Sequence, residues 1–170
     1  MTLVGIEQPQ FVLIDGTLRL KAYDGDYRKA VTWYRDPVVY RNSEGIADAG
    51  KIPDGDYVRK MYEYLSTSGE LYFIEVLEDG EFVSIGDVTL KGENPSIAIG
   101  VPRYRGIGIG KKVMMAIIAR ARELGIARFY GTKIYDYNTA SRRLFESLGF
   151  KCVGVQGNTR IYELGLDDAQ

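Results

Sequence analysis

The segment from Val101 to Lys112 is the part of this sequence whose residue types and spacing best suit binding chemistry. It reads VPRYRGIGIGKK and lies between a run typical of a β-strand and a run typical of an amphipathic helix. The first turn of a helix has backbone N–H groups without partners and a positive dipole end, and both favour a phosphate. Glycines at alternate positions (Gly106, Gly108 and Gly110) let the main chain approach such an anion without clashes from Cβ atoms. The segment therefore predicts a phosphate-binding turn.

The spacing of these glycines excludes two familiar phosphate loops. A P-loop has the pattern Gly-x-x-x-x-Gly-Lys-Ser/Thr, but here Arg105 stands in place of the first glycine and Lys112 in place of the hydroxyl residue. A dinucleotide loop has the pattern Gly-x-Gly-x-x-Gly, and the sixth position counted from Gly106 is Lys111. A turn that only connects a strand to a helix is the plain alternative, and the basic residues around the glycines argue against it.

Two motifs resemble those of one enzyme superfamily. Residues 105–110 (RGIGIG) match Arg/Gln-x-x-Gly-x-Gly/Ala and resemble the pyrophosphate loop of the GNAT superfamily of acyl-CoA N-acyltransferases. Residues 138–150 (NTASRRLFESLGF) are similar to the helix and turn with which that superfamily holds the pantetheine arm. The serine after the alanine in this helix, together with residues 85–88 (IGDV), resembles the branch that acetylates ribosomal-protein amino termini. The order of elements extends the resemblance over most of the chain.

The resemblance implies an acetyl-CoA-dependent N-acetyltransferase and a set of residues that bind this co-substrate. Main-chain amides of the loop would hold the diphosphate, and a Val101 N–H would polarise the thioester carbonyl. Asn138 and Ser141 would contact the pantetheine, although Asn138 also fits a plain helix cap. The implied acyl-CoA-binding residues are Ile99, Gly100, Val101, Arg105, Gly106, Ile107, Gly108, Ile109, Gly110, Lys111, Asn138 and Ser141.

The implied reaction is direct attack of an amine on the thioester, which needs a base for the amine and a donor for the tetrahedral oxyanion. We expect Asp87 or Glu75, on strands that would flank the cleft, to act as the base through a water molecule. Many members of the superfamily use a tyrosine as the acid for the departing thiolate, and here that position is Phe145. Tyr135, Tyr137 or water could serve instead, or the thiolate leaves unaided. The alternative to an enzyme is a catalytically silent module that binds acyl-CoA as a sensor.

The implied acceptor is a primary amine of a small molecule or a peptide, held by residues 27–65. That stretch places tyrosines and a tryptophan beside carboxylates, which suits a cationic amine through ion pairs and cation–π contacts. The plain alternative is that most of these aromatic side chains pack on the sheet. Residues 1–95 carry 10 basic and 17 acidic side chains, and residues 96–170 carry 12 and 6. This asymmetry fits an acidic half that receives a cation and a basic half that binds an anion.

The composition excludes several other classes of protein. The 170 residues include no histidine and one cysteine, Cys152, which excludes Ser-His-Asp and Cys-His catalysis, histidine-bound zinc and internal disulfides. We expect no metal, no membrane span, no signal peptide and a cytoplasmic location. The net charge of -1 argues against a nucleic-acid partner. The sequence leaves open whether the protein forms a homodimer.

The elements that would position these residues follow from the spacing of apolar side chains. Alternating or apolar runs predict strands, and stripes every three or four residues predict helices. The predicted strands are Thr17–Tyr23, Glu70–Leu77, Phe82–Leu90, Ser96–Val101, Ala127–Ile134, Lys151–Val155 and Arg160–Leu166. The predicted helices are 26–34, one after Pro53-Asp54, Lys111–Leu124 and one that Asn138 opens. Asp36-Pro37 ends the first helix, and a long loop covers Arg41–Asp56.

This order predicts an α/β protein with a mixed, mostly antiparallel central sheet of about seven strands and helices on both faces, as in the GNAT-like acyltransferase fold. We expect residues 1–170 to form a single acyltransferase domain. Its acceptor-side half would be about residues 1–95 and its acyl-CoA-binding half about residues 96–170.

Overall fold

A computed structural model describes residues 2–3 and 5–166 of the chain. Its strands are β1 (Thr2–Leu3), β2 (Ile6–Glu7), β3 (Phe11–Asp15), β4 (Leu18–Ala22), β5 (Glu70–Glu78), β6 (Glu81–Leu90), β7 (Ser96–Ile99), β8 (Arg128–Tyr135), β9 (Lys151–Gln156) and β10 (Thr159–Gly165). Its α-helices are α1 (Arg28–Tyr34), α2 (Pro37–Glu44), α3 (Gly55–Ser68), α4 (Ile109–Glu123) and α5 (Thr139–Ser147). Short 3-10 turns cover Ala49–Lys51 and Pro102–Tyr104.

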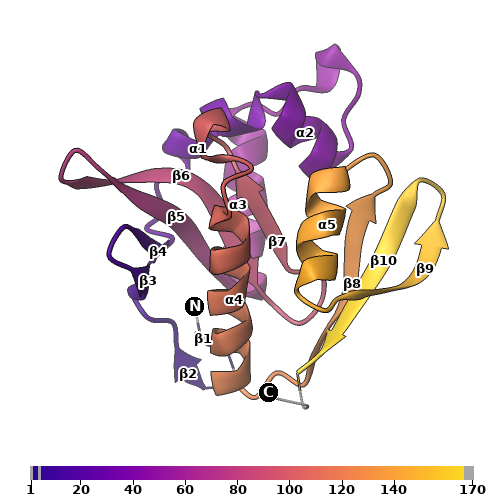
Figure 1. Cartoon of the computed structure of the whole chain (residues 1–170). Coiled ribbons are helices and arrows are strands. Elements are labelled where there is room, and N and C mark those ends of the chain that lie inside the picture. Colours follow the sequence, from indigo (N-terminus) through magenta and orange to yellow (C-terminus); the bar gives the residue numbers. More distant parts are fainter. Residues whose placement is uncertain (1, 4, 167–170) are drawn as a thin grey trace.

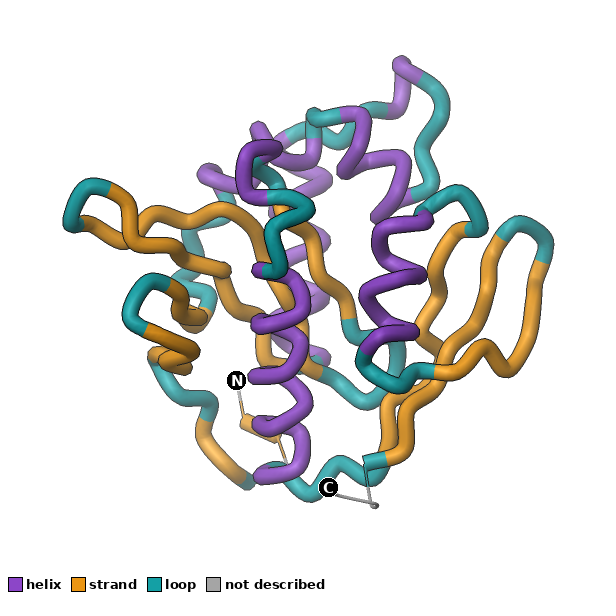
Figure 2. Tube along the Cα trace, in the orientation of Figure 1, coloured by secondary structure: helices purple, strands orange, loops and turns teal. Residues whose placement is uncertain are grey.

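The strands form two main sheets rather than one. Five antiparallel strands run in the order β3-β4-β5-β6-β7, and three run in the order β8-β10-β9. In the described chain, one isolated parallel bridge joins Glu93, just before β7, to Tyr130 of β8. Beyond it, β7 and β8 diverge (Figure 1), and the two groups of strands lie on either side of α5 (Figure 2). The expected mixed, mostly antiparallel α/β sheet is confirmed, but it is split, and β1, β2 and β3 were not predicted.

Two hydrophobic clusters hold helices on opposite faces of the five-stranded sheet. The first joins strands β4–β6 and β8 to α4 and α5, and its buried side chains include Tyr72, Ile117 and Phe129. The second joins the other face to α1 and α3 through Trp33 and Phe73, together with Tyr62. Figure 1 shows α4 in front of the sheet and α3 behind it. Burial of such large side chains dominates the stability of this arrangement.

One segment differs from its sequence-based prediction in a way that shapes the site. Pro37 does not only end α1, because it is also the first residue of α2, where a missing N–H breaks no helical bond. The Asp36 carboxylate caps this helix by accepting from the Val38 N–H at 2.9 Å. Gly45, with φ of 67°, ends it in the left-handed region. The predicted loop at 41–56 is therefore wrong over its first residues, which belong to α2.

The part of the chain that the structure describes contains neither a membrane-spanning helix nor a metal-binding cluster. No helix there is long and apolar enough to cross a membrane. No group of three or more Cys, Asp or Glu side chains in that same part is arranged to hold a metal ion.

Candidate active site

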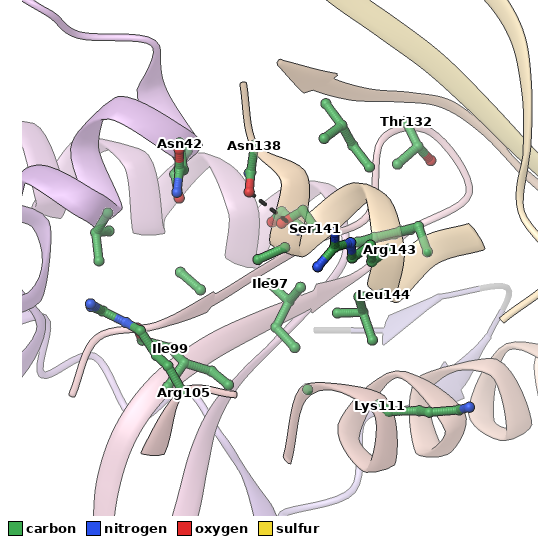
Figure 3. A pocket seen from close by; sticks show the side chains of 18 of the residues that line it. Asn42, Ile97, Ile99, Arg105, Lys111, Thr132, Asn138, Ser141, Arg143 and Leu144 are labelled. Carbon is green, nitrogen blue, oxygen red and sulfur yellow. Dashed lines mark hydrogen bonds between the residues drawn. The ribbon is translucent and has the colours of Figure 1, made fainter. Parts of the chain in front are cut away.

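A cavity of about 600 Å³ occupies the space where β7 and β8 diverge. Its walls come from α2, β7, the glycine loop, the start of α4, β8 and α5, so both halves of the chain contribute (Figure 3). The lining residues are Val38, Val39, Asn42, Ser43, Asn94, Pro95, Ser96, Ile97, Ala98, Ile99, Arg105, Gly106, Gly108, Gly110, Lys111, Thr132, Lys133, Ile134, Asn138, Ala140, Ser141, Arg143, Leu144, Phe145 and Ser147.

The charged residues that line this cavity are all basic. Arg105, Lys111, Lys133 and Arg143 are among the lining residues, and none of the lining residues is Asp or Glu. A slot with cations and no carboxylate attracts an anionic ligand. The apolar residues between these cations suit the uncharged part of such a ligand.

Three glycines of the loop (Gly106, Gly108 and Gly110) line the cavity. Gly106 and Gly108 have φ of 72° and 91°, a conformation that side chains rarely adopt, and a Cβ at either position would meet no atom within 4 Å. Gly108 is the N-cap of α4 and supplies no side chain to the first N–H groups of the helix. Gly110 sits against Leu144, whose Cδ2 would lie 3.3 Å from an added Cβ. These N–H groups remain available for an anion.

The basic residues that flank the loop divide into two pairs. Arg103 turns away to Glu78 and Lys112 to Asp15, at 2.7 and 3.1 Å. Arg105 and Lys111 line the cavity. The expectation that charge surrounds the loop therefore holds for one pair of these residues.

In the described chain, the edge of β7 that faces the cavity is not paired with another strand of its sheet. The Gly100 N–H donates to the Ile85 carbonyl of β6 at 2.7 Å, so the neighbouring Ile99 carbonyl points to the opposite edge. The Arg105 Nε donates to this Ile99 carbonyl at 2.8 Å. An open strand edge of this kind can pair with an extended amide-containing ligand.

Asn138 and Ser141 lie together on the wall opposite β7. Asn138 is the N-cap of α5, and its Oδ1 accepts from the Ser141 N–H at 3.2 Å. Both residues also line the cavity, and Figure 3 shows the bond between them beside the slot. The plain helix-cap interpretation of Asn138 is therefore correct, and it does not exclude contact with a ligand.

Four residues of the predicted binding set do not line the cavity: Gly100, Val101, Ile107 and Ile109. Gly100 packs against Trp33, whose Cγ would lie 2.1 Å from an added Cβ. Val101 packs between the two hydrophobic clusters. Ile107 is exposed, and Ile109 is packed at the start of α4.

Asp87 lies one strand away from the cavity, in a buried cluster with two tyrosines. It pairs across the ladder with Ala98, which lines the cavity. Its Oδ2 accepts hydrogen bonds from the hydroxyls of Tyr34, at 2.8 Å, and Tyr62, at 2.6 Å. Burial raises the pKa of Asp87 to about 6, although both hydrogen bonds oppose this shift by favouring the charged form.

Glu75, the other candidate base, is engaged elsewhere. Its Oε1 accepts from Arg19 Nε at 2.8 Å, and the Arg19 guanidinium also stacks on the rings of Phe11 and Phe82. Glu75 pairs with Ser84 on β6 and does not line the cavity. The structure thus brings Asp87, and not Glu75, next to the residues of the slot.

The tyrosines considered as acids for the thiolate face α2 rather than the slot. The Tyr137 hydroxyl donates to the Arg41 carbonyl, and the Tyr135 hydroxyl sits against Gly45. Phe145 does line the cavity, but its ring has no proton to give, and it packs edge-on against Phe150.

A comparison with models of protein families shows which family has this arrangement. The model of the Acetyltransferase (GNAT) family matches residues 38–150, which hold β7, the glycine loop, α4 and α5. The chain belongs to the GNAT acetyltransferase family. Among curated proteins, this GNAT chain is 42% identical over 100 residues to an N-acetyltransferase 9-like protein of Caenorhabditis elegans. That match covers 48% of this chain and 49% of the relative, so it spans about half of the relative's length.

Solved structures share the fold of this GNAT chain at low sequence identity. The yncA acetyltransferase of Salmonella typhimurium, solved with acetyl-CoA, has a TM-score of 0.66 and 22% identity, over 90% of this chain and 96% of that one. RimL, a ribosomal L7/L12 alpha-N-protein acetyltransferase solved with coenzyme A, has a TM-score of 0.69 and 15% identity, over 92% and 98%. At these identities the likeness shows the fold alone.

Three parts of this GNAT site were missed by the sequence analysis. The wall that α2 contributes, made of some of residues 38–43, was not predicted. The reason is that Pro37 was interpreted only as the end of a helix, whereas it is also the first residue of α2. Thr132 and Ile134 line the slot from β8, and their alternation in the strand was the available signal. Arg143 lines it from α5, on the helix that already contained the second motif.

Proposed function

We propose that this protein transfers an acetyl group from acetyl-CoA to a primary amine of a small molecule or peptide, by direct attack of the amine on the thioester. The observation that carries this proposal is the slot between β7 and β8, which has basic residues, no carboxylate in its lining and an open strand edge. The name of the curated relative, an N-acetyltransferase 9-like protein, supports transfer to nitrogen.

In this proposal the chain binds acetyl-CoA mainly through its backbone. The N–H groups of the loop and of the first turn of α4, from Gly106 to Lys111, hold the diphosphate. The free edge of β7 at Ile99 pairs with the pantetheine amides, while Asn138 and Ser141 form the facing wall. Because Arg105 occupies the Ile99 carbonyl, the pantetheine displaces that contact when it binds.

Asp87 is the base in this proposal. A carboxyl group whose pKa is about 6 is mostly ionised at neutral pH, yet it is a better proton acceptor than an exposed aspartate. The hydroxyls of Tyr34 and Tyr62 fix the orientation of its Oδ2. Asp87 is buried and absent from the cavity lining, so the proton of the ammonium reaches it through a water molecule beside Ala98.

The acceptor is a cationic amine that enters from the side of α2 and α3. Glu44, near the end of α2, is partly buried, and burial together with the negative charge of Asp87 raises its pKa. Tyr57 of α3 lies beside it, and hydrogen bonding to Tyr57 lowers the pKa of Glu44. Two carboxylates that repel each other next to an aromatic ring suit a positive charge between them.

The test is release of free thiol from acetyl-CoA in the presence of a panel of amines: peptides with free amino termini, polyamines and amino acids. We expect amine-dependent thiol release and a mass increase of one acetyl group on the amine. The matched control is each amine blocked beforehand by acetylation. If coenzyme A binds by calorimetry but no amine in the panel accelerates thiol release, the protein is an acyl-CoA sensor and the transferase proposal is wrong.

A further inference from the structure

Thr132 carries a buried hydroxyl that has no hydrogen-bond partner in the described part of the chain. The residue lies on β8, is 1% exposed and lines the slot, where Figure 3 labels it among the lining side chains. A buried polar atom without a partner destabilises the folded protein, and a ligand that enters the slot can supply the missing partner. The Thr132 hydroxyl therefore indicates that the ligand has a polar group at this place.

Thr132 lies at the end of the slot where the two strands are still close together. The parallel bridge joins Glu93 to Tyr130, and Thr132 is two positions beyond this bridge on β8. The Lys133 N–H, next along the strand, donates to Oδ1 of Asn94 at 3.1 Å. The slot therefore begins beside Thr132, and the strands separate further toward the glycine loop.

The proposed donor reaches this end of the slot with its acyl group. Its diphosphate lies at the loop that follows β7, so its pantetheine runs back along β7 past Ile99. The thioester follows the last pantetheine amide and therefore lies beside Ile97. Thr132 is level with Pro95, since each is two positions beyond the bridge, so it lies about 7 Å further along the strand direction. An acetyl group ends short of this hydroxyl, whereas a four-carbon acyl group with a polar end comes within hydrogen-bond distance.

The charges of the slot favour a carboxylate as this polar end. Lys133 follows Thr132 and also lines the slot, and no ion pair of its ammonium is found among the described residues. Ser96 and Ser147 line the slot as well, and none of the lining residues is Asp or Glu. A hydroxyl that donates to a carboxylate forms a charge-assisted hydrogen bond. An acyl chain that ends in a methyl group would leave the Thr132 hydroxyl without a partner.

We propose that the slot accepts, in addition to acetyl-CoA, a short acyl-CoA whose acyl group ends in a carboxylate, such as a succinyl group, and that Thr132 recognises this end. The inference rests on the proposed function, because it uses the position of the acyl-CoA in the slot, but it does not depend on which amine is the acceptor. Transfer of such a group balances as acetyl transfer does. A nitrogen–carbon bond forms, the carbon–sulfur bond breaks, and the amine loses a proton while coenzyme A leaves as the thiol.

The experiment compares the dissociation constants of succinyl-CoA and butyryl-CoA by calorimetry, with acetyl-CoA as the reference. The first two ligands have acyl chains of equal length that end in a carboxylate and in a methyl group. We expect the unaltered protein to bind succinyl-CoA about tenfold more tightly than butyryl-CoA, as one charge-assisted hydrogen bond provides. Thr132→Val removes the hydroxyl and keeps the shape of the side chain. It should abolish this preference and change the dissociation constant of acetyl-CoA by less than about twofold.

Two variants serve as controls. Thr132→Ser keeps the hydroxyl and should keep most of the preference for succinyl-CoA. Thr89→Val removes a second buried hydroxyl without a partner, which lies on β6 and does not line the slot. It should change none of the three dissociation constants. Thermal unfolding of each variant shows that a change in affinity does not come from loss of the fold.

Three results would overturn the inference. Equal binding of succinyl-CoA and butyryl-CoA, or tighter binding of butyryl-CoA, would show that the hydroxyl does not meet the acyl group. Equal weakening of all three ligands by Thr132→Val would assign Thr132 to the shape of the slot. Binding of acetyl-CoA alone would show that the slot has no room for a longer acyl group.

The same measurements separate this inference from the proposed function. If the unaltered protein binds none of the three ligands, both fail. If it binds them with the expected preference but no amine accelerates thiol release, the transferase proposal fails and the recognition of the carboxylate by Thr132 stands.

Discussion

The Arg105 guanidinium joins the loop that faces the cavity to the start of α2. Its Nη2 lies 3.2 Å from Oδ2 of Asp36, while its Nε donates to the Ile99 carbonyl. Asp36 uses its other oxygen, Oδ1, to cap α2 through the Val38 N–H. The two side chains are about one quarter exposed, so the ion pair is partly shielded from water. One carboxylate thus fixes both the helix that forms a wall of the slot and the arginine beside the proposed diphosphate site.

This relationship predicts that Asp36→Asn binds coenzyme A more tightly than the unaltered protein. The asparagine can still cap α2, but it no longer neutralises Arg105, so the positive potential at the slot rises. We expect a dissociation constant lower by about threefold and a steeper salt dependence. Calorimetry at two salt concentrations measures both.

The control for that variant is Asp36→Ala, which removes the cap as well as the charge. It should lose about 1 kcal/mol of stability relative to Asp36→Asn, measured by urea unfolding. Coenzyme A binding that weakens in Asp36→Asn would show that the ion pair serves to position Arg105 for the ligand and not to restrain its charge.

The second prediction concerns the pH dependence of the reaction. Asp87 accepts a proton only when ionised, and its pKa is about 6. We therefore expect kcat/KM to fall below about pH 6, and Asp87→Asn to lower it by at least about a hundredfold. The residual activity of the variant should lack this acidic limb. Glu75→Gln, which removes a carboxylate paired with Arg19, should keep the limb; if it is Glu75→Gln that loses it, the assignment of the base is wrong.

The third prediction concerns stability and follows from the same pKa. Because burial raises the pKa of Asp87 from 3.8 to about 6, the folded protein holds this proton more tightly than the unfolded chain. The contribution of Asp87 to the free energy of unfolding is thus greatest below about pH 4 and falls as pH rises through about 6, by on the order of 3 kcal/mol. In Asp87→Asn this loss is absent. The difference in Tm between the variant and the unaltered protein should therefore become more positive from pH 4 to pH 8, and a constant difference would contradict it.

The fourth prediction separates the binding role of the loop glycines from their backbone strain. Gly108→Asp places a negative charge at the N-cap of α4, and we expect it to weaken coenzyme A binding by more than about a hundredfold. Gly125→Asp is the matched control, because Gly125 also has a positive φ, of 73°, and open space around it. Both variants should lose about 1 kcal/mol of stability. Equal affinities in the two variants would remove the diphosphate from this turn.

The parts of the site that could be predicted from the sequence are those encoded by neighbouring residues. The glycine loop and the Asn138 cap each lie within a few positions, and their local chemistry specifies their conformation. The Asp87 cluster could not be predicted as a cluster, because Tyr34 is 53 positions away from Asp87 and the two meet only through helix packing. The same holds for α2, whose place at the slot depends on the Asp36–Arg105 pair, 69 positions apart.

The pattern of apolar residues alone does not predict where the sheet divides. Runs of β-type residues at β7 and β8 look alike whether the strands pair fully or diverge. Here a single parallel bridge at Glu93 and Tyr130 is found between them in the described chain, and Gly100 and Pro102 stop β7 soon afterwards. The expected mixed, mostly antiparallel sheet is therefore present, and it is divided between β7 and β8.

In the described part of the chain, one bridge joins the two main sheets, and no strand fills the space between β7 and β8. In the proposed complex, the pantetheine of acetyl-CoA lies in that space and its amide groups pair with the edge of β7. The protein with acetyl-CoA bound should then have a higher free energy of unfolding than the empty protein. The stability of the folded chain would therefore depend on the concentration of the proposed acyl donor.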